Sequence, residues 1–211
     1  MERPEAGLRQ RIFAWALARF NARYEHFVSK YKAKLFADLS GTVLEIGPGT
    51  GVNLRYLASA NVRWIGVEPN PFMHTYLREA AGRLGIPVEL QTGTAEALPV
   101  AADSVDVVIS TLVLCCVPNQ QQSLREVLRV LKPGGKLVFI EHVAGPDGSW
   151  LRFVQNLVTP VWKRLGDGCM PNRETWAAIE GAGFERVTYE RITAPLFIVS
   201  PQIAGEAIKA A

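Results

Sequence analysis

The sequence predicts an α/β fold: a doubly wound, mostly parallel sheet of seven strands with helices on both faces. Three observations predict it. Short β-branched runs alternate with helical stretches through the middle of the chain, a glycine-rich turn follows the first run, and two β-rich segments near the end are spaced to pair as an antiparallel hairpin. Alternating strands and helices favour parallel pairing through crossover connections, and the hairpin adds two final strands.

Five runs are expected to form the parallel strands. They are almost continuously apolar, which is typical of strands buried on both faces of a sheet. Pro133-Gly134-Gly135 is predicted to end the helix before the fifth strand. The expected strands are residues 42–46, 63–68, 88–91, 105–110 and 136–142, and the expected helices between them are about 52–59, 71–84 and 119–131.

The segments on either side of this alternation differ from it. Residues 1–36 are interpreted as a basic helical extension and residues 37–211 as the main domain. Near the end, residues 150–165 are apolar and interrupted at Pro160, a helix is expected over 173–180, and residues 185–192 and 197–203 form the expected hairpin. In the extension, side chains recur at steps of three and four on one face of an amphipathic helix: Phe13, Leu17, Phe20, Tyr24, Phe27, Tyr31 and Leu35.

The net charge of +3 is divided unevenly along the chain. Residues 1–36 hold eight Lys and Arg against three Asp and Glu, a charge of +5, so residues 37–211 carry −2. A mildly acidic body argues against a nucleic-acid partner. The apolar content of 48% excludes a disordered chain, and no transmembrane run or secretory signal is found, so a cytoplasmic protein is expected.

The three cysteines, Cys115, Cys116 and Cys169, lack the C-x-x-C spacing of many metal and redox sites. The sequence therefore predicts no metal site and no dithiol motif. An odd number of cysteines favours a reducing compartment. Cys115 and Cys116 are interpreted as small, buried apolar residues.

The strongest motif is the turn Gly47-Pro48-Gly49-Thr50-Gly51, which follows the first expected strand. Glycine lets the backbone turn sharply and approach a ligand closely. Glu68 ends the next strand, 21 residues after Gly47, where a carboxylate can accept the hydroxyl hydrogens of a ribose. The dinucleotide fingerprint needs glycine where Val52 stands, and the phosphate-loop pattern is absent, so another nucleotide-like ligand is favoured.

With Glu45 before it, this turn reads E-x-G-x-G-x-G and resembles motif I of the class I S-adenosylmethionine-dependent methyltransferases, which have a Rossmann-like fold. Similar motifs follow in order over about residues 40–145. The resemblance implies S-adenosylmethionine as cofactor and S-adenosylhomocysteine as its product. The implied cofactor-binding residues are Glu45, Gly47, Pro48, Gly49, Thr50 and Gly51 at its amino-acid part, Glu68, Pro69, Asn70 and Met73 at the ribose and adenine, Thr94, Ala95 and Glu96 over the adenine, and Thr111 and Leu112 beside the reactive end.

A closer resemblance, over roughly residues 30–209, is to the animal methyltransferase-like thiol S-methyltransferases. Its motifs include T-L-V-L-C at 111–115, E-H-V-A at 141–144, Pro160-x-Trp162 and Asp167-Gly168-Cys169. The resemblance implies methylation of small, apolar thiols. Those proteins carry an N-terminal hydrophobic membrane anchor, which is not expected in this chain. They also usually have Asp and Cys where this chain has Glu68 and Pro48.

The residues alone leave the acceptor atom open between sulfur and oxygen. A thiol has a pKa of about 8.5 and is partly ionised near neutral pH, whereas a phenol or alcohol depends more on a general base. His142, at the end of the fifth expected strand, is the candidate catalytic residue, which would take the acceptor proton or orient the acceptor. The competing functions are a nicotinamide-dependent dehydrogenase, which Val52 disfavours, and a cofactor-binding module without catalysis.

The acceptor pocket is expected between the flanking segments and the sheet. Its candidate lining residues are Tyr24, Phe27, Tyr31, Cys115 and Trp150. The helix of the extension has three interpretations: a lid over the cofactor, a contact between residues 8–35 and an anionic membrane surface, or simple packing on the body. The expected partner is a small-molecule acceptor, and neither nucleic acid nor a partner protein is implied.

Overall fold

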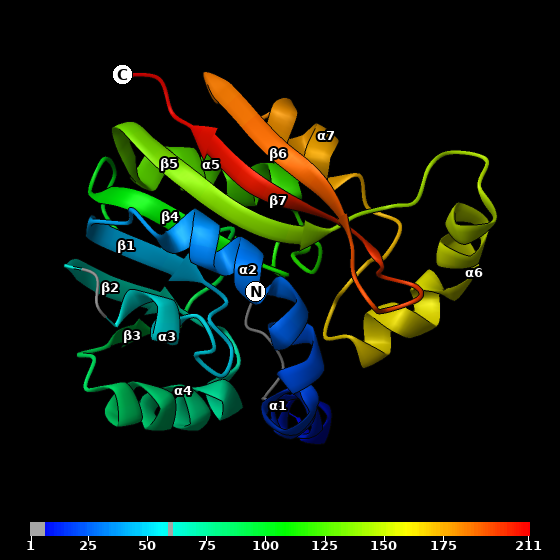
Figure 1. Ribbon diagram of the computed structural model, residues 1–211, viewed down its shortest axis with the longest axis horizontal. Helices are drawn as coiled ribbons and strands as arrows, with labels where there is room; N and C mark the ends of the chain where they lie inside the picture. The colour runs from blue at the N-terminus through cyan, green and yellow to red at the C-terminus, as the bar shows by residue number, and fades with distance from the viewer. Residues whose placement is uncertain (1–6, 59–60) are drawn as a thin grey trace.

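The computed structural model describes residues 7–58 and 61–211, and these contain a seven-stranded sheet (Figure 1). Its strands are β1 (Gly41–Ile46), β2 (Val62–Val67), β3 (Glu89–Gln91), β4 (Val105–Thr111), β5 (Leu131–His142), β6 (Arg186–Thr193) and β7 (Pro201–Ile208). They follow the order β3-β2-β1-β4-β5-β7-β6. The first five run parallel, while β7 is antiparallel to both β5 and β6. The predicted doubly wound, mostly parallel sheet is therefore confirmed.

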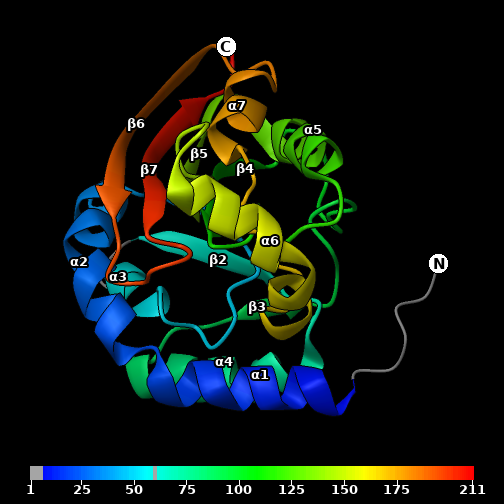
Figure 2. The ribbon, with the colours of Figure 1, turned by 90° about the vertical axis from the view of Figure 1, so that its right-hand side faces the viewer.

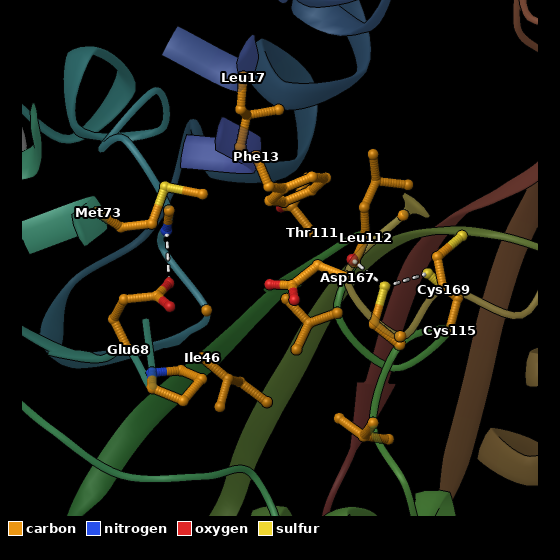
Figure 3. A pocket seen from close by; sticks show the side chains of 18 of the residues that line it. Phe13, Leu17, Ile46, Glu68, Met73, Thr111, Leu112, Cys115, Asp167 and Cys169 are labelled. Carbon is orange, nitrogen blue, oxygen red and sulfur yellow. Dashed lines mark hydrogen bonds between the residues drawn. The ribbon is translucent and has the colours of Figure 1, made fainter. Parts of the chain in front are cut away.

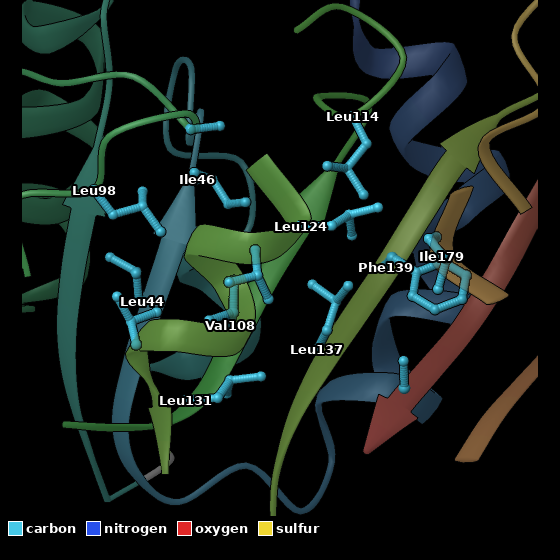
Figure 4. Close-up of a cluster of buried hydrophobic side chains, with 14 of the residues drawn as sticks. Leu44, Ile46, Leu98, Val108, Leu114, Leu124, Leu131, Leu137, Phe139 and Ile179 are labelled. Carbon is cyan, nitrogen blue, oxygen red and sulfur yellow. The ribbon is translucent and has the colours of Figure 1, made fainter. Parts of the chain in front are cut away.

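Helices cover both faces of this sheet. They are α1 (Leu8–Phe20), α2 (Ala22–Phe36), α3 (Leu54–Leu57), α4 (Pro71–Leu84), α5 (Gln120–Val130), α6 (Trp150–Leu165) and α7 (Thr175–Glu180). On one face, Leu44 and Val108 of the sheet pack with Leu124 of α5 and Ile179 of α7 (Figure 4). On the other, Val43 packs with side chains of α2, α3 and α4. Successive residues of a strand point to opposite faces, so β1 contributes to both layers.

The N-terminal segment forms two helices, where the apolar stripe predicted one. The break falls at Asn21, which ends α1 and precedes α2. After the break, α2 lies on the sheet, whereas α1 turns away and runs beside α4 (Figure 2). Asn21 donates from Nδ2 to Glu25 Oε1 at 3.3 Å, and asparagine is favoured at helix boundaries because its side chain competes for local hydrogen bonds.

Other features of the elements also differ from the sequence expectation. The last strand begins at Pro201 instead of 197, because Thr193 pairs with Pro201 and leaves a loop between them, where Phe197 is exposed. Strand β5 begins at Leu131, so the Pro-Gly-Gly stretch lies within an irregular strand that includes a register shift against β4. Pro160 lies inside the single helix α6 and does not interrupt it.

Two helices carry exposed apolar faces. In α1, Leu8, Ile12 and Trp15 point to solvent. In α6, a stripe at steps of three and four is exposed, consisting of Trp150, Phe153, Leu157, Val161 and Leu165. Neither face indicates a membrane-spanning segment, because none of the helices within 7–58 and 61–211 has the length and apolarity that crossing a membrane needs.

Candidate active site

A cavity of about 1000 Å³ lies at the carboxyl ends of the parallel strands (Figure 3). Its base contains the ends of β1, β2, β4 and β5, represented by Ile46, Val67, Thr111 and His142. Segments from α1 and from the loop after α6 complete the wall. The carboxyl edge of a doubly wound sheet is where ligands bind, because the connections to helices leave a crevice there.

The glycine turn after β1 forms one wall of this cavity. Gly47 and Gly49 have φ angles of +57° and +55°, a region that favours glycine. A Cβ atom on Gly47 would lie 2.7 Å from Val113 Cγ2, so a side chain there cannot be accommodated without a shift. Pro48 and Thr50 also line the cavity. Gly51 does not, because it packs against α4, where Leu77 lies.

Glu68 lies between the glycine turn and the start of α4. Its Oε2 accepts a hydrogen bond from the Gly49 N–H at 3.0 Å, and its Oε1 accepts one from the Asn70 N–H at 2.8 Å. Asn70 caps α4 by accepting from the Phe72 N–H at 3.1 Å and lies outside the cavity wall. The remaining predicted residues of this side all line the cavity: Pro69, Met73, Thr94, Ala95 and Glu96.

A buried polar corner adjoins the turn. Glu45 accepts hydrogen bonds from Asn53 Nδ2 at 2.8 Å and from Trp64 Nε1 at 3.0 Å. Burial raises the pKa of Glu45, and these two hydrogen bonds oppose that shift. Asn53 Nδ2 also donates to Thr111 Oγ1 at 3.2 Å. Among the described residues, Asn53 Oδ1 is a buried oxygen without a hydrogen-bond partner, which suits a cationic donor entering the cavity.

Beneath this corner, α2 contributes a buried ion pair that the sequence analysis missed. Lys32 Nζ lies 2.7 and 2.9 Å from the two oxygens of Glu25, and Lys32 is fully buried. Burial lowers the pKa of Lys32, and the Glu25 carboxylate counteracts this effect. The sequence pattern that could have predicted this ion pair is the seven-residue spacing of Glu25 and Lys32. It places both side chains on the face of the helix that also buries Val28.

The predicted acceptor-pocket residues are only partly brought together. Tyr24 lines the cavity and donates its hydroxyl hydrogen to Gln202 Oε1 at 2.9 Å, and burial raises its pKa well above the usual value. Phe27 and Tyr31 lie outside the cavity, because α2 directs them onto the sheet. Trp150 is also outside; the residue is 70% exposed on the outer face of α6, and its ring stacks on Phe153.

A second side of the cavity is built around sulfur. Cys115 lines it as expected, and Cys116, Cys169 and Trp162 also line it. The three sulfur atoms lie within 4.8 Å of one another, although the sequence predicted no such grouping. Trp162 Nε1 donates to Cys169 Sγ at 3.1 Å. Hydrogen bonds from the neighbouring thiols, with His142 alongside, lower the pKa of Cys169.

His142 is buried beside this sulfur group. Its Nε2 lies 3.2 Å from the Met170 carbonyl oxygen and 3.6 Å from Cys169 Sγ, while its Nδ1 lies 3.9 Å from the same sulfur. Burial alone would lower the pKa of His142, but the interaction with Cys169 outweighs it and raises that pKa. The ring thus lines the cavity and is also held by a backbone carbonyl.

Glu141 shapes the turn that carries two of the cysteines. Its carboxylate accepts hydrogen bonds from Ser110 Oγ at 2.6 Å and from the backbone N–H groups of Val113, Leu114 and Cys115 at 3.1 to 3.2 Å. The turn begins at Leu112, whose φ of +57° is unusual for a residue with a side chain. Hydrogen bonds to one buried carboxylate therefore hold the backbone beside the cavity.

Helix α1 lies over the opening. Phe13 and Leu17 project between the Met73 side and the Leu112 side of the cavity (Figure 3). One hydrogen bond joins α1 to each side of the cavity. Arg9 Nη1 donates to the Arg164 carbonyl oxygen at 2.8 Å, and Asn70 Nδ2 donates to the Gln10 carbonyl oxygen at 3.3 Å. Of the three interpretations of the extension, this placement favours a lid for α1 and packing for α2.

The fold and the site are typical of a doubly wound domain that binds a nucleotide-like cofactor. The features that indicate this class are the strand order, the glycine turn after β1 and the acid after β2. Comparisons with known proteins narrow this class. A family model described as "Methyltransferase domain" matches residues 44–139. A solved structure of a SAM-dependent methyltransferase from Thermotoga maritima, 22% identical over 93% of this chain and 99% of that one, has the same fold with a TM-score of 0.62.

Two human proteins cover nearly the whole sequence. The thiol S-methyltransferases TMT1A and TMT1B are 39% and 37% identical to it, each over 93% of this chain and 86% of that protein. The chain belongs to the methyltransferase family that contains these two proteins. It is an S-adenosylmethionine-dependent enzyme, and its acceptor is a small molecule.

Proposed function

We propose that this enzyme methylates the sulfur of small, apolar thiols. The observation that carries the proposal is the cavity wall beyond β4, where Leu112, Cys115, Cys116, Trp162 and Leu196 present apolar and sulfur-containing groups. Such a wall favours an apolar acceptor with a soft reactive atom. The names of the two human relatives give the proposal independent support.

The opposite wall fits the cofactor. Asn53 Oδ1 is a buried acceptor without a partner among the described residues, and the Glu45 carboxylate lies next to it, so both suit the ammonium group of the cofactor. Gly47 and Gly49 leave room for its amino-acid chain. Glu68 is held at the position where it can accept hydrogen bonds from a ribose. When bound, the cofactor supplies a methyl group on a positively charged sulfur.

The protein's contribution to methyl transfer is alignment and exclusion of water. Phe13 and Leu17 cover the cavity, which favours a direct in-line displacement between aligned sulfur atoms. A thiol acceptor with a pKa of about 8.5 already supplies some thiolate near neutral pH. His142 therefore has no required role as a base in this proposal, which agrees with its hydrogen bond to the Met170 carbonyl group.

The test is release of S-adenosylhomocysteine across a panel of acceptors of matched size: an alkyl thiol, the corresponding selenol, a phenol and a carboxylate. We expect the thiol and selenol to react at least about 100-fold faster than the phenol. The candidate bases in the cavity wall are already engaged, His142 with the Met170 carbonyl group and Asp167 with the Arg9 guanidinium group. A faster phenol would assign the enzyme to oxygen methylation. Binding of the cofactor without turnover on any acceptor would favour a non-catalytic binding module.

We also propose that residues 8–35 contact an anionic membrane surface from the cytoplasmic side. In α1, the exposed apolar side chains Leu8, Ile12 and Trp15 lie close in sequence to Arg11 and Arg19. An apolar strip flanked by basic residues suits a lipid interface with negative headgroups. Because the same helix covers the cavity, this contact would place the opening near the source of apolar acceptors.

Vesicle flotation tests the membrane contact. The protein should float with vesicles that contain phosphatidylserine and remain unbound with neutral phosphatidylcholine vesicles, and higher salt should weaken the binding. The double variant Arg11→Glu/Arg19→Glu should lose most of it. Arg186→Glu, an exposed charge reversal on β6, serves as the control and should bind like the wild type. Equal flotation of both variants would exclude this surface.

A further inference from the structure

The sulfur side of the cavity has the dimensions of a metal site. Cys115 and Cys116 come from the turn after β4, and Cys169 comes from the loop after α6. Their sulfur atoms all lie within 4.8 Å of one another, and those of Cys115 and Cys116 are 3.5 Å apart. A zinc ion with Zn–S bonds of about 2.3 Å holds its sulfur ligands roughly 3.8 Å apart. The Cys115–Cys116 separation is thus already near this spacing, and the distances to Cys169 need to shorten by at most about 1 Å.

His142 lies beside one of the three sulfur atoms, that of Cys169, and is the candidate for a fourth ligand. The His142 Nε2 atom lies 3.2 Å from the Met170 carbonyl oxygen, which can only accept, so Nε2 carries the hydrogen. The lone pair of the neutral ring is then on Nδ1, 3.9 Å from Cys169 Sγ. Metal-bound histidines commonly donate their other N–H to a backbone carbonyl group in this way.

The surroundings also suit a metal-thiolate group. Trp162 donates a hydrogen bond to Cys169 Sγ, and Glu141 fixes the backbone N–H of Cys115. Three thiolates and a divalent ion leave one net negative charge. The guanidinium group of Arg173 lies close by, because it donates to the carbonyl oxygens of Leu114 and Val117 on either side of the cysteine pair.

We propose that Cys115, Cys116 and Cys169, as thiolates, and His142, through Nδ1, bind one divalent zinc ion in the cavity wall. Binding forms three metal–sulfur bonds and one metal–nitrogen bond, and the thiol protons pass to solvent. The ion fastens the loop after α6 to the turn after β4, two segments that come from distant parts of the sequence. This inference does not depend on the acceptor being a thiol.

The experiment measures bound metal on the full chain, produced without a histidine tag, loaded with zinc and freed of excess ion. Elemental analysis should find about one zinc per chain, and a thiol reagent should modify the protein slowly until a chelator is added. Replacement of zinc by cobalt should give the intense thiolate-to-cobalt absorption. Trp162→Phe should weaken zinc binding by about 10- to 100-fold, as loss of an outer hydrogen bond does.

Single substitutions identify the ligands. Cys116→Ser, Cys169→Ser and His142→Ala should each retain little zinc, whereas His26→Gln, on the exposed face of α2, should retain as much as the wild type. Circular dichroism shows which variants are folded. If a variant does not fold, the cobalt spectrum of the wild type still reports thiolate ligation.

Three outcomes would overturn the proposal: a wild-type protein without bound zinc and with three freely reactive thiols, zinc content unchanged in every variant, or a mass two hydrogens lower that reveals a disulfide. None of these readouts uses methyl transfer. Failure of the zinc proposal can therefore be distinguished from failure of the proposed function.

Discussion

The two sides of the cavity are built with different chemistry. Along β1 and β2, carboxylates and amides such as Glu45, Asn53 and Glu68 are linked by short hydrogen bonds to one another and to the backbone. Beyond β4 and β5, sulfur and apolar side chains predominate. The Asp167 carboxylate on this wall pairs with Arg9, and Glu141 points away into the turn that it supports. One space can therefore receive a charged cofactor and an apolar acceptor, because their partners are separated between the two halves of the carboxyl edge of the sheet.

The largest effect should follow from breaking the buried ion pair under the polar side. Lys32→Met leaves Glu25 buried without its cation, which should lower the free energy of unfolding by about 3–5 kcal/mol in urea denaturation. Lys34→Met on the same helix removes an exposed lysine and should change it by less than about 0.5 kcal/mol. Similar losses in both variants would show that the pair does not support the polar side.

Glu68→Ala should have the next largest effect, on cofactor binding. Loss of hydrogen bonds to a charged group, worth about 1.5–3 kcal/mol, should weaken S-adenosylmethionine binding by roughly 10- to 150-fold in calorimetry. Glu89→Ala, at an exposed ion pair on the neighbouring strand, is the matched control and should bind normally. Unchanged affinity in Glu68→Ala would remove this residue from the cofactor site.

Asn53→Ala should affect only the part of the polar side that receives the amino-acid part of the cofactor. The unpartnered Oδ1 atom is proposed to meet the ammonium group, so S-adenosylhomocysteine should bind about 10-fold more weakly. 5′-Methylthioadenosine, which lacks the amino-acid part, should bind with unaltered affinity. An equal loss for both ligands would mean that the substitution distorts the whole site.

The smallest effect should come from a change in helix α1, which covers both sides of the cavity. Phe13→Ala opens part of the cover and should raise the KM for an apolar acceptor by about 3- to 10-fold, with little change in kcat. Phe20→Ala, whose ring is exposed on the same helix, should leave both constants unaltered. If both variants behave alike in steady-state assays, α1 does not act as a cover.

The sequence predicted most of the polar side because its signals are local, although Gly51 and Asn70 lie outside the cavity and the Lys32–Glu25 pair was missed. Most of the parallel strands are nearly continuous apolar runs, and the glycine turn and Glu68 occupy fixed positions at strand ends. The sulfur side could not be predicted in the same way. Cys116 and Cys169 meet only because the loop after α6 returns across the ends of the strands, and no spacing rule describes that path.

The wrong predictions for the N-terminal helices and for α6 have a similar cause. The stripe from Phe13 to Tyr31 suggested a single helix, but the cavity and the sheet require two directions, which the break at Asn21 provides. Within α6, Trp150 and Trp162 differ by 12 residues and so lie on different faces, and only Trp162 reaches the cavity. Which side chains of a helix face the cavity depends on how the helix is rotated about its axis, and packing sets that rotation.

The placement of β7 between β5 and β6 bears on how the chain folds during synthesis. Strand β6 is at the edge of the sheet and pairs with β7, which follows it in the chain. When β6 leaves the ribosome, its neighbour has not yet been made, so the sheet closes only after Pro201–Ile208 has emerged. The hydrogen bond from Tyr24 to Gln202 also forms only after this strand has been made. Addition of β7 therefore joins the N-terminal and C-terminal parts of the domain.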